Sequence, residues 1–166
     1  MKERAPFVTM QPLEERESLR RWLDYHRDTL IYKVQGVDAD GLAFSPVDSG
    51  TSLGGLIRHM YGVEAYWFQD IFTGRNAADH WNDPWERNND FSGDQLIAIF
   101  EEACAVNREI ELQAGSLDER AVGSVSWADG AHPTLRWVMN HVIEEEARHN
   151  GHADLLREMI DGSVGD

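Results

Sequence analysis

Three residues in the sequence have the types and the spacing needed to bind a divalent metal ion. Glu145 and His149 are four residues apart in a segment with helical periodicity, so their side chains leave one face of a helix and can converge on one point. Two ligands from one helix rarely suffice, and His59, in the middle of an earlier helical segment, is the candidate for the third. Two imidazoles and one carboxylate suit zinc best, and also nickel, iron or manganese. Three protein ligands leave a coordination position open for water, a thiolate or a substrate, as in catalytic sites.

The last helical segment carries polar residues where apolar ones are expected. Its predicted buried seam, followed in steps of three and four, is Val138, Val142, Glu145, His149, His152, Leu156 and Met159. The two ends of this seam are apolar, whereas its middle turns hold Glu and His, which cost free energy when buried without a partner. A metal ion would supply that partner. In the alternative interpretation each histidine is an ordinary hydrogen-bonded core residue and the acidic run 144–146 is a solvated face; the spacing alone leaves both open.

Other polar residues of the same segment are candidates for supporting roles. His141 lies one turn before the ligand pair and His152 lies one turn after it. Each could replace a proposed ligand, or could orient one through a hydrogen bond. Arg148 could bind a substrate carboxylate or form an ion pair with Glu144.

Several residues elsewhere could line a pocket. His26 interrupts the apolar stripe of the first helical segment, either as a pocket residue or as a buried, hydrogen-bonded histidine. Trp81, Trp85 and Trp127 lie in long predicted loops, where they could form pocket walls. The lone cysteine, Cys104, follows a predicted core position by one turn, so we expect it to be buried rather than nucleophilic.

Hydrophobic periodicity predicts the elements that must position these residues. The helical segments are residues 14–36, 51–73, 92–115 and 133–160. Four helices of this length predict an all-α four-helix bundle, which we expect to be one domain over residues 1–166. Residues 1–12 form an N-terminal tail or a strap over the bundle. Two long connecting loops, 75–91 and 116–132, exceed the usual length in bundles and often serve as a lid or pocket wall.

Composition and charge exclude several classes of function. The net charge of −15 argues against nucleic acid or an anionic membrane as a partner. A single cysteine excludes an intramolecular disulfide framework and a cysteine-rich zinc module. The first residues do not resemble a secretory signal, and no apolar run approaches the length of a membrane helix. We therefore expect a cytoplasmic enzyme or binding protein, with a homodimer as a plausible assembly.

Longer stretches of the sequence resemble a known superfamily. The segments HVIEEEARHNGHADLLREMIDG (141–162) and SGTSLGGLIRHMYGVEAYWF (49–68) resemble the DinB/YfiT-like superfamily. The resemblance begins near WLDYHRDTLIYKV (22–34) and is strongest to the actinobacterial branch related to mycothiol-dependent S-transferases and mycothiol-dependent maleylpyruvate isomerase. It implies a DinB-like bundle of the up-down-down-up type. It also implies a metal held by a His of the second helix and two residues four apart on the last.

Carried onto this sequence, the resemblance implies His59, Glu145 and His149 as the ligands, with His141 and His152 outside the ligand set. Many members have three histidines, whereas the mycothiol-using isomerase has His, Glu and His. The implied function is a metal-dependent mycothiol-type S-transferase or thiol-assisted isomerase acting on a small electrophile. The alternatives are a metal-dependent hydrolase with a metal-bound water, and a non-enzymatic, metal-binding, stress-associated protein.

Overall fold

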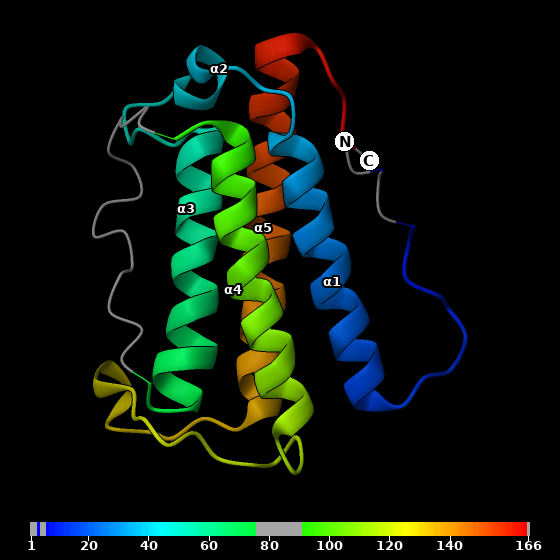
Figure 1. Cartoon of the computed structure of the whole chain (residues 1–166), viewed down its shortest axis with the longest axis vertical. Helices are drawn as coiled ribbons and strands as arrows, with labels where there is room; N and C mark the ends of the chain where they lie inside the picture. The colour runs from blue at the N-terminus through cyan, green and yellow to red at the C-terminus, as the bar shows by residue number, and fades with distance from the viewer. Residues whose placement is uncertain (1–2, 4–5, 76–90, 166) are drawn as a thin grey trace.

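The protein is a bundle of long helices, described for residues 3, 6–75 and 91–165 of the computed structural model. Its principal elements are α1 (Glu15–Val34), α3 (Leu53–Glu64) continued by the π-helix η1 (Ala65–Phe72), α4 (Gly93–Gln113) and α5 (Leu135–Asp161). These helices lie side by side along the long axis, with α1 and α5 running in one direction and α3 and α4 in the other (Figure 1). The described residues contain no β-strand beyond two isolated bridges. The predicted all-α fold is confirmed.

Side-chain caps begin three of the long helices, close to the starts of the predicted helical segments. Ser52, Ser92 and Thr134 each accept a hydrogen bond from a backbone N–H in the first turn of α3, α4 and α5. Such a bond satisfies one of the four N–H groups that a helix start leaves without a partner, and contributes about 1 kcal/mol. Gly74 and Gly162 follow the ends of η1 and α5 with positive φ, a conformation that glycine adopts without steric cost.

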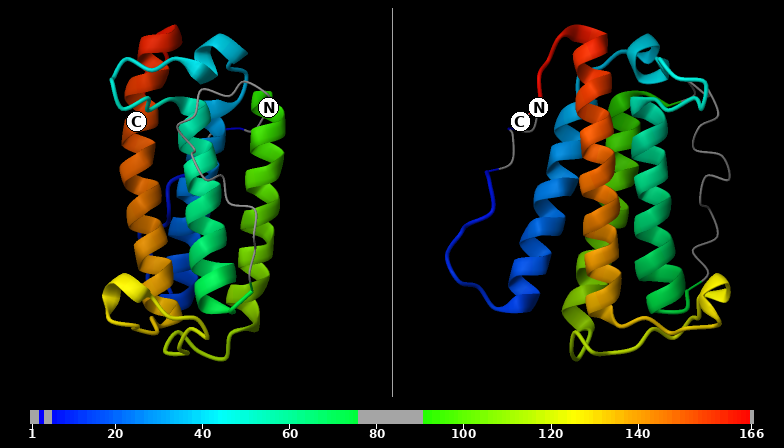
Figure 2. Two further views of the ribbon diagram at one scale, coloured as in Figure 1. Left: turned by 90° about the vertical axis from the view of Figure 1, so that its left-hand side faces the viewer. Right: turned by 180° about the vertical axis from the view of Figure 1, so that it is seen from behind.

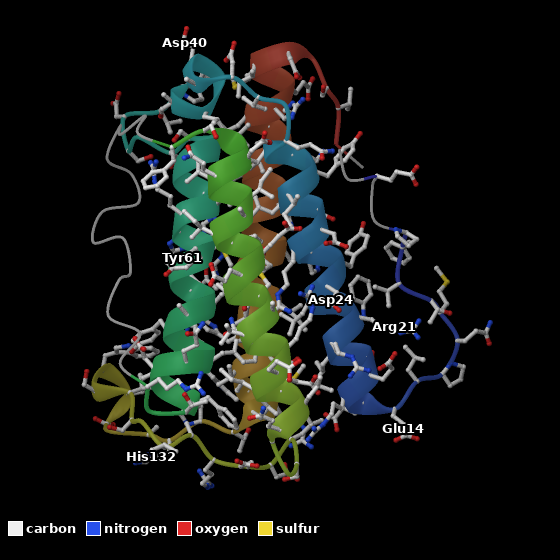
Figure 3. All side chains as sticks on the ribbon, viewed as in Figure 1. Glu14, Arg21, Asp24, Asp40, Tyr61 and His132 are labelled. Atoms are coloured by element: carbon white, nitrogen blue, oxygen red, sulfur yellow. The ribbon has the colours of Figure 1, made fainter. Side chains whose placement is uncertain are left out.

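Apolar side chains from all the long helices fill the space between them (Figure 3). The fully buried ones include Leu30, Leu53, Leu56, Met60, Phe100, Leu135, Val138, Met139 and Val142. Burial of one such side chain contributes about 1.5–3 kcal/mol. Cys104 is buried, as predicted, and burial raises the pKa of its thiol well above the usual range. None of the described helices has the length and hydropathy needed to cross a membrane.

The connections hold more structure than the sequence predicts. Residues 37–50, between the first two predicted helical segments, contain the short helix α2 (Ala39–Ala43), which Asp38 caps by accepting from the N–H of Gly41. The predicted loop 116–132 contains a 3₁₀ turn, η2 (Ser126–Ala128). The other predicted long loop, 75–91, lies almost entirely outside the described residues.

The buried face of α5 differs from the predicted seam in its C-terminal half. Glu146, Asn150 and Ala153 are buried, whereas His152 is exposed and Met159 is 63% exposed. The reason is that α5 packs against both α1 and α3, so its most buried line passes between these two neighbours. Val138, Val142 and Leu156 of the predicted seam are buried on that line. The other seam residues lie beside it, at the edge of the core: Glu145, His149, His152 and Met159.

A polar cluster interrupts the apolar core, and the sequence analysis did not single it out. The guanidinium of Arg27 on α1 donates to both carboxylate oxygens of Glu64 on α3, at 2.6 and 2.7 Å. Asn107 on α4 donates to Glu64 at 2.7 Å. Asp24, labelled on α1 in Figure 3, pairs with Arg27 and with Arg108 of α4. The cluster therefore joins three helices through charge-assisted hydrogen bonds.

Candidate metal centre

The candidate metal centre lies between α3 and α5, which are neighbours in the bundle (Figure 2, left). His59 is in the middle of α3, and Glu145 and His149 are on successive turns in the middle of α5. Both helices are fixed by their caps and by the apolar residues above and below these positions. The three side chains predicted from spacing therefore come from two rigid elements.

The potential ligand atoms of these three residues converge. Nε2 of His149 lies 3.4 Å from Oε2 of Glu145, and Nε2 of His59 lies 3.9 Å from the same oxygen. The two imidazole rings are 4.6 Å apart, centroid to centroid, with an angle of 74° between their planes. One donor atom from each residue lies within 4.8 Å of the others. Two imidazole nitrogens and one carboxylate oxygen are a donor set that suits a divalent transition metal.

Burial and neighbouring charges keep both histidines in the neutral form that can bind a cation. The side chains of His59, Glu145 and His149 are 28, 16 and 11% exposed. Burial lowers the pKa of His59 against the opposing effect of Glu145. The pKa of His149 is lowered to about 4, mainly by burial and further by the charges of His59 and His152. Both imidazoles are thus neutral at pH 7, the form that binds metal.

His152 and His141 contact the centre from its two ends. Nδ1 of His152 lies 3.2 Å from Nδ1 of His149, on the side of the ring away from Glu145. Nε2 of His141 lies 3.9 Å from Oε1 of Glu145, the oxygen that does not face the other two histidines. Both therefore occupy the positions expected of residues that orient ligands.

A second group of donors overlaps the first. His141, Glu144 and Glu145 also place one donor atom each within 4.8 Å of one another. Glu144 is exposed, however, and forms an ion pair with Arg148, whose other nitrogen is 3.6 Å from Oε1 of Glu145. Arg148 is 54% exposed. Arg148 therefore contacts the carboxylates of both Glu144 and Glu145.

Of the candidate pocket residues that the structure describes, Arg148 contacts the centre, whereas His26 and Trp127 contact residues other than the three metal donors. His26 is half-buried on α1, where its backbone carbonyl accepts from Asn150 and its Nδ1 lies 3.5 Å from the same amide nitrogen. Trp127 is 70% exposed, and its ring lies 6.3 Å from that of Trp67. Trp81 and Trp85 lie outside the described residues.

Aromatic residues around His141 were missed by the sequence analysis. The ring of Trp137 stacks on His141 at 4.9 Å and 22°, and Trp67 of η1 meets the same imidazole edge-on at 4.8 Å. Trp137 and His141 are four residues apart on α5, and this spacing was the available signal. The packing fixes the ring of His141, and with it the direction of its Nε2.

Comparisons with known proteins show the family and the fold of the chain. The family model described as mycothiol-S-transferase matches residues 18–162. No curated protein matches the sequence. Among solved structures, a conserved protein from Enterococcus faecalis is similar, with a TM-score of 0.63 and 13% identity over 92% of this chain and 100% of that one; this similarity concerns the fold alone. Since the family model covers most of the sequence, the chain belongs to the mycothiol-S-transferase family of the DinB/YfiT-like superfamily.

Proposed function

We propose that the protein is a metal-dependent S-transferase that joins a mycothiol-type thiol to a small electrophile. His59, Glu145 and His149 would hold the metal, with zinc as the first candidate. The observation that carries the proposal is the convergence of one donor atom from each of these residues within 4.8 Å. Family membership supports the identity of the thiol.

The residues of the centre fit a thiol-activating role. A divalent cation bound there would lower the pKa of a thiol enough to make it a thiolate at neutral pH. Glu145 supplies one negative charge and the two neutral imidazoles supply none, so the three residues neutralise only half of a 2+ charge. The partial exposure of His59 leaves access for substrates from one side.

The overall reaction balances without another reagent. The thiol sulfur forms a bond to the electrophilic carbon, and the bond from that carbon to its leaving group breaks, with the electron pair leaving on that group. The thiol proton passes to solvent. The chain's contribution is to hold the reactants together at a half-buried site, where electrostatic effects are stronger than in water.

The test combines metal analysis with kinetics. Purified protein loaded with zinc should bind about one ion per chain and should consume monochlorobimane at a rate that depends on both metal and mycothiol. The variants His59→Ala, Glu145→Gln and His149→Ala should lose most of the bound metal and reduce the rate by about 100-fold or more, the scale on which one electrostatic catalytic group acts. His132→Ala, in the 116–132 connection, is the matched control and should behave as the parent.

Each contrary outcome identifies a different function. Consumption of the electrophile at the same rate without any thiol would overturn the transferase proposal and favour a hydrolase. A bound metal without thiol-dependent activity on a broad panel of electrophiles would favour a non-enzymatic metal-binding protein. Activity that survives removal of the metal would overturn the role of the three ligands.

A further inference from the structure

A groove of about 720 Å³ opens beside the C-terminal part of α5. One wall is the segment that follows α2, and the other is the exposed side of α5. Its lining residues are Pro46, Val47, Thr51, His152, Leu155, Leu156, Glu158 and Met159. The volume is in the range of about 300–1,000 Å³ that is usual for small-molecule sites.

The groove adjoins the candidate metal centre at one residue, His152. His152 lines the groove, and its Nδ1 lies 3.2 Å from Nδ1 of His149. Along α5, Glu145, His149, His152 and Met159 follow one another in steps of three, four or seven. This strip therefore leads from the metal donors into the groove.

The lining favours one class of occupant. Val47, Leu155 and Met159 are 48, 64 and 63% exposed, which is costly for apolar side chains unless something covers them. The groove's charged side chain is Glu158, and none of its described lining residues is Lys or Arg. An apolar, uncharged molecule would cover the aliphatic side chains, whereas an anion would meet Glu158 with no cation to compensate it.

We propose that this groove binds the apolar part of the electrophile, so that the enzyme selects bulky uncharged substrates over anionic ones. The inference rests on the proposed S-transferase function. It commits to a small molecule rather than a second copy of the chain because the groove is concave and leads to the donor atoms. It also favours transfer to apolar electrophiles over isomerisation of a dicarboxylate.

Three electrophiles with one reactive carbon provide the test: iodoacetanilide, iodoacetamide and iodoacetate. With zinc and mycothiol, kcat/KM should be highest for the anilide and lowest for the acetate. In the double variant Leu155→Ser/Met159→Ser the ratio of anilide to amide should fall by about tenfold. Leu112→Ser removes a leucine of α4 that is 56% exposed, against 64% for Leu155, and should leave that ratio unchanged. Glu158→Lys should raise the ratio of acetate to amide.

A binding measurement separates failure of this inference from failure of the proposed function. Nile red, a neutral apolar dye, should bind the zinc-loaded parent with a Kd about tenfold lower than that for the double variant, as followed by fluorescence. Equal dye binding and equal substrate ratios in all variants would overturn the groove assignment, even if iodoacetamide is still consumed. A change of oligomeric state in the double variant, measured by sedimentation, would instead identify the groove as a contact between copies and would also overturn it.

Discussion

Nδ1 of His149 lies 3.2 Å from Nδ1 of His152, while Nε2 of the same His149 ring lies 3.4 Å from Oε2 of Glu145. The two nitrogens of one imidazole thus face different partners. A hydrogen bond at Nδ1 fixes the tautomer and the orientation of the ring, which leaves Nε2 to bind a metal. We therefore expect His152, one turn further along α5, to orient the donor atom of His149.

We expect His152→Ala to weaken metal binding without removing a ligand. Loss of a residue that orients a metal-binding histidine typically lowers affinity by about 10–100-fold. The measurement is zinc affinity by competition with a chromophoric chelator, and His132→Ala is the control for loss of a histidine outside the centre. Since His152 is exposed, its replacement should leave thermal stability nearly unchanged. An unaltered zinc affinity would show that His149 needs no support from His152.

The ion pair of Arg27 and Glu64 should stabilise the bundle as a unit. Arg27→Met leaves the carboxylate of Glu64, which is 0% exposed, without its cation, and should lower the free energy of unfolding by about 3–5 kcal/mol. Arg27→Met combined with Glu64→Met removes both charges and should recover a large part of that loss. Urea unfolding of the parent, both single variants and the double variant gives the coupling energy. Additive effects of the two substitutions would contradict the pairing.

Glu146 should make stability depend on pH. It is fully buried, neither of its oxygens has a hydrogen-bond partner among the described residues, and burial together with the nearby Glu64 raises its pKa well above the usual 4.5. The folded protein therefore holds this proton to a higher pH than the unfolded chain does. The Glu146 carboxyl therefore makes its full contribution to the free energy of unfolding below about pH 4.5. That contribution is lost as the pH rises toward the folded-state pKa.

Glu146→Gln removes this dependence because glutamine does not titrate. Between pH 5 and pH 8, the free energy of unfolding should fall for both proteins. The fall should be smaller for Glu146→Gln than for the parent by at least about 1 kcal/mol, which corresponds to roughly one pKa unit. Urea unfolding at several pH values measures the difference. Glu102→Gln, at an exposed position of α4, is the matched control. Parallel curves for Glu146→Gln and the parent would contradict the raised pKa.

Much of the fold could be predicted from local signals. The caps Ser52, Ser92 and Thr134 and the glycines after the helices act through nearby backbone, so their effect is readable from the sequence. The metal donors were also accessible, because a spacing of four on a helix fixes the relative direction of Glu145 and His149. Packing between helices that are distant in the sequence could not be predicted in this way. Which of Glu145 and Glu146 is buried depends on how α5 rotates between α1 and α3.

The same limit explains the residues that were missed. Arg27 and Glu64 are 37 positions apart, and nothing local distinguishes a buried pair from two solvated charges. The exposed position of Met159 reflects the edge of the core, which periodicity alone does not locate. The predicted seam residues from Glu145 to Met159 are thus better described as a strip from the metal donors into the apolar groove.

The most direct test of the central claim is a crystal structure of the zinc-loaded protein with anomalous scattering data at the zinc edge. We expect one strong anomalous peak within about 2.0–2.2 Å of Nε2 of His59, a carboxylate oxygen of Glu145 and Nε2 of His149, with one coordination position open to solvent. A peak held instead by His141 and Glu144, or no peak between α3 and α5, would contradict it.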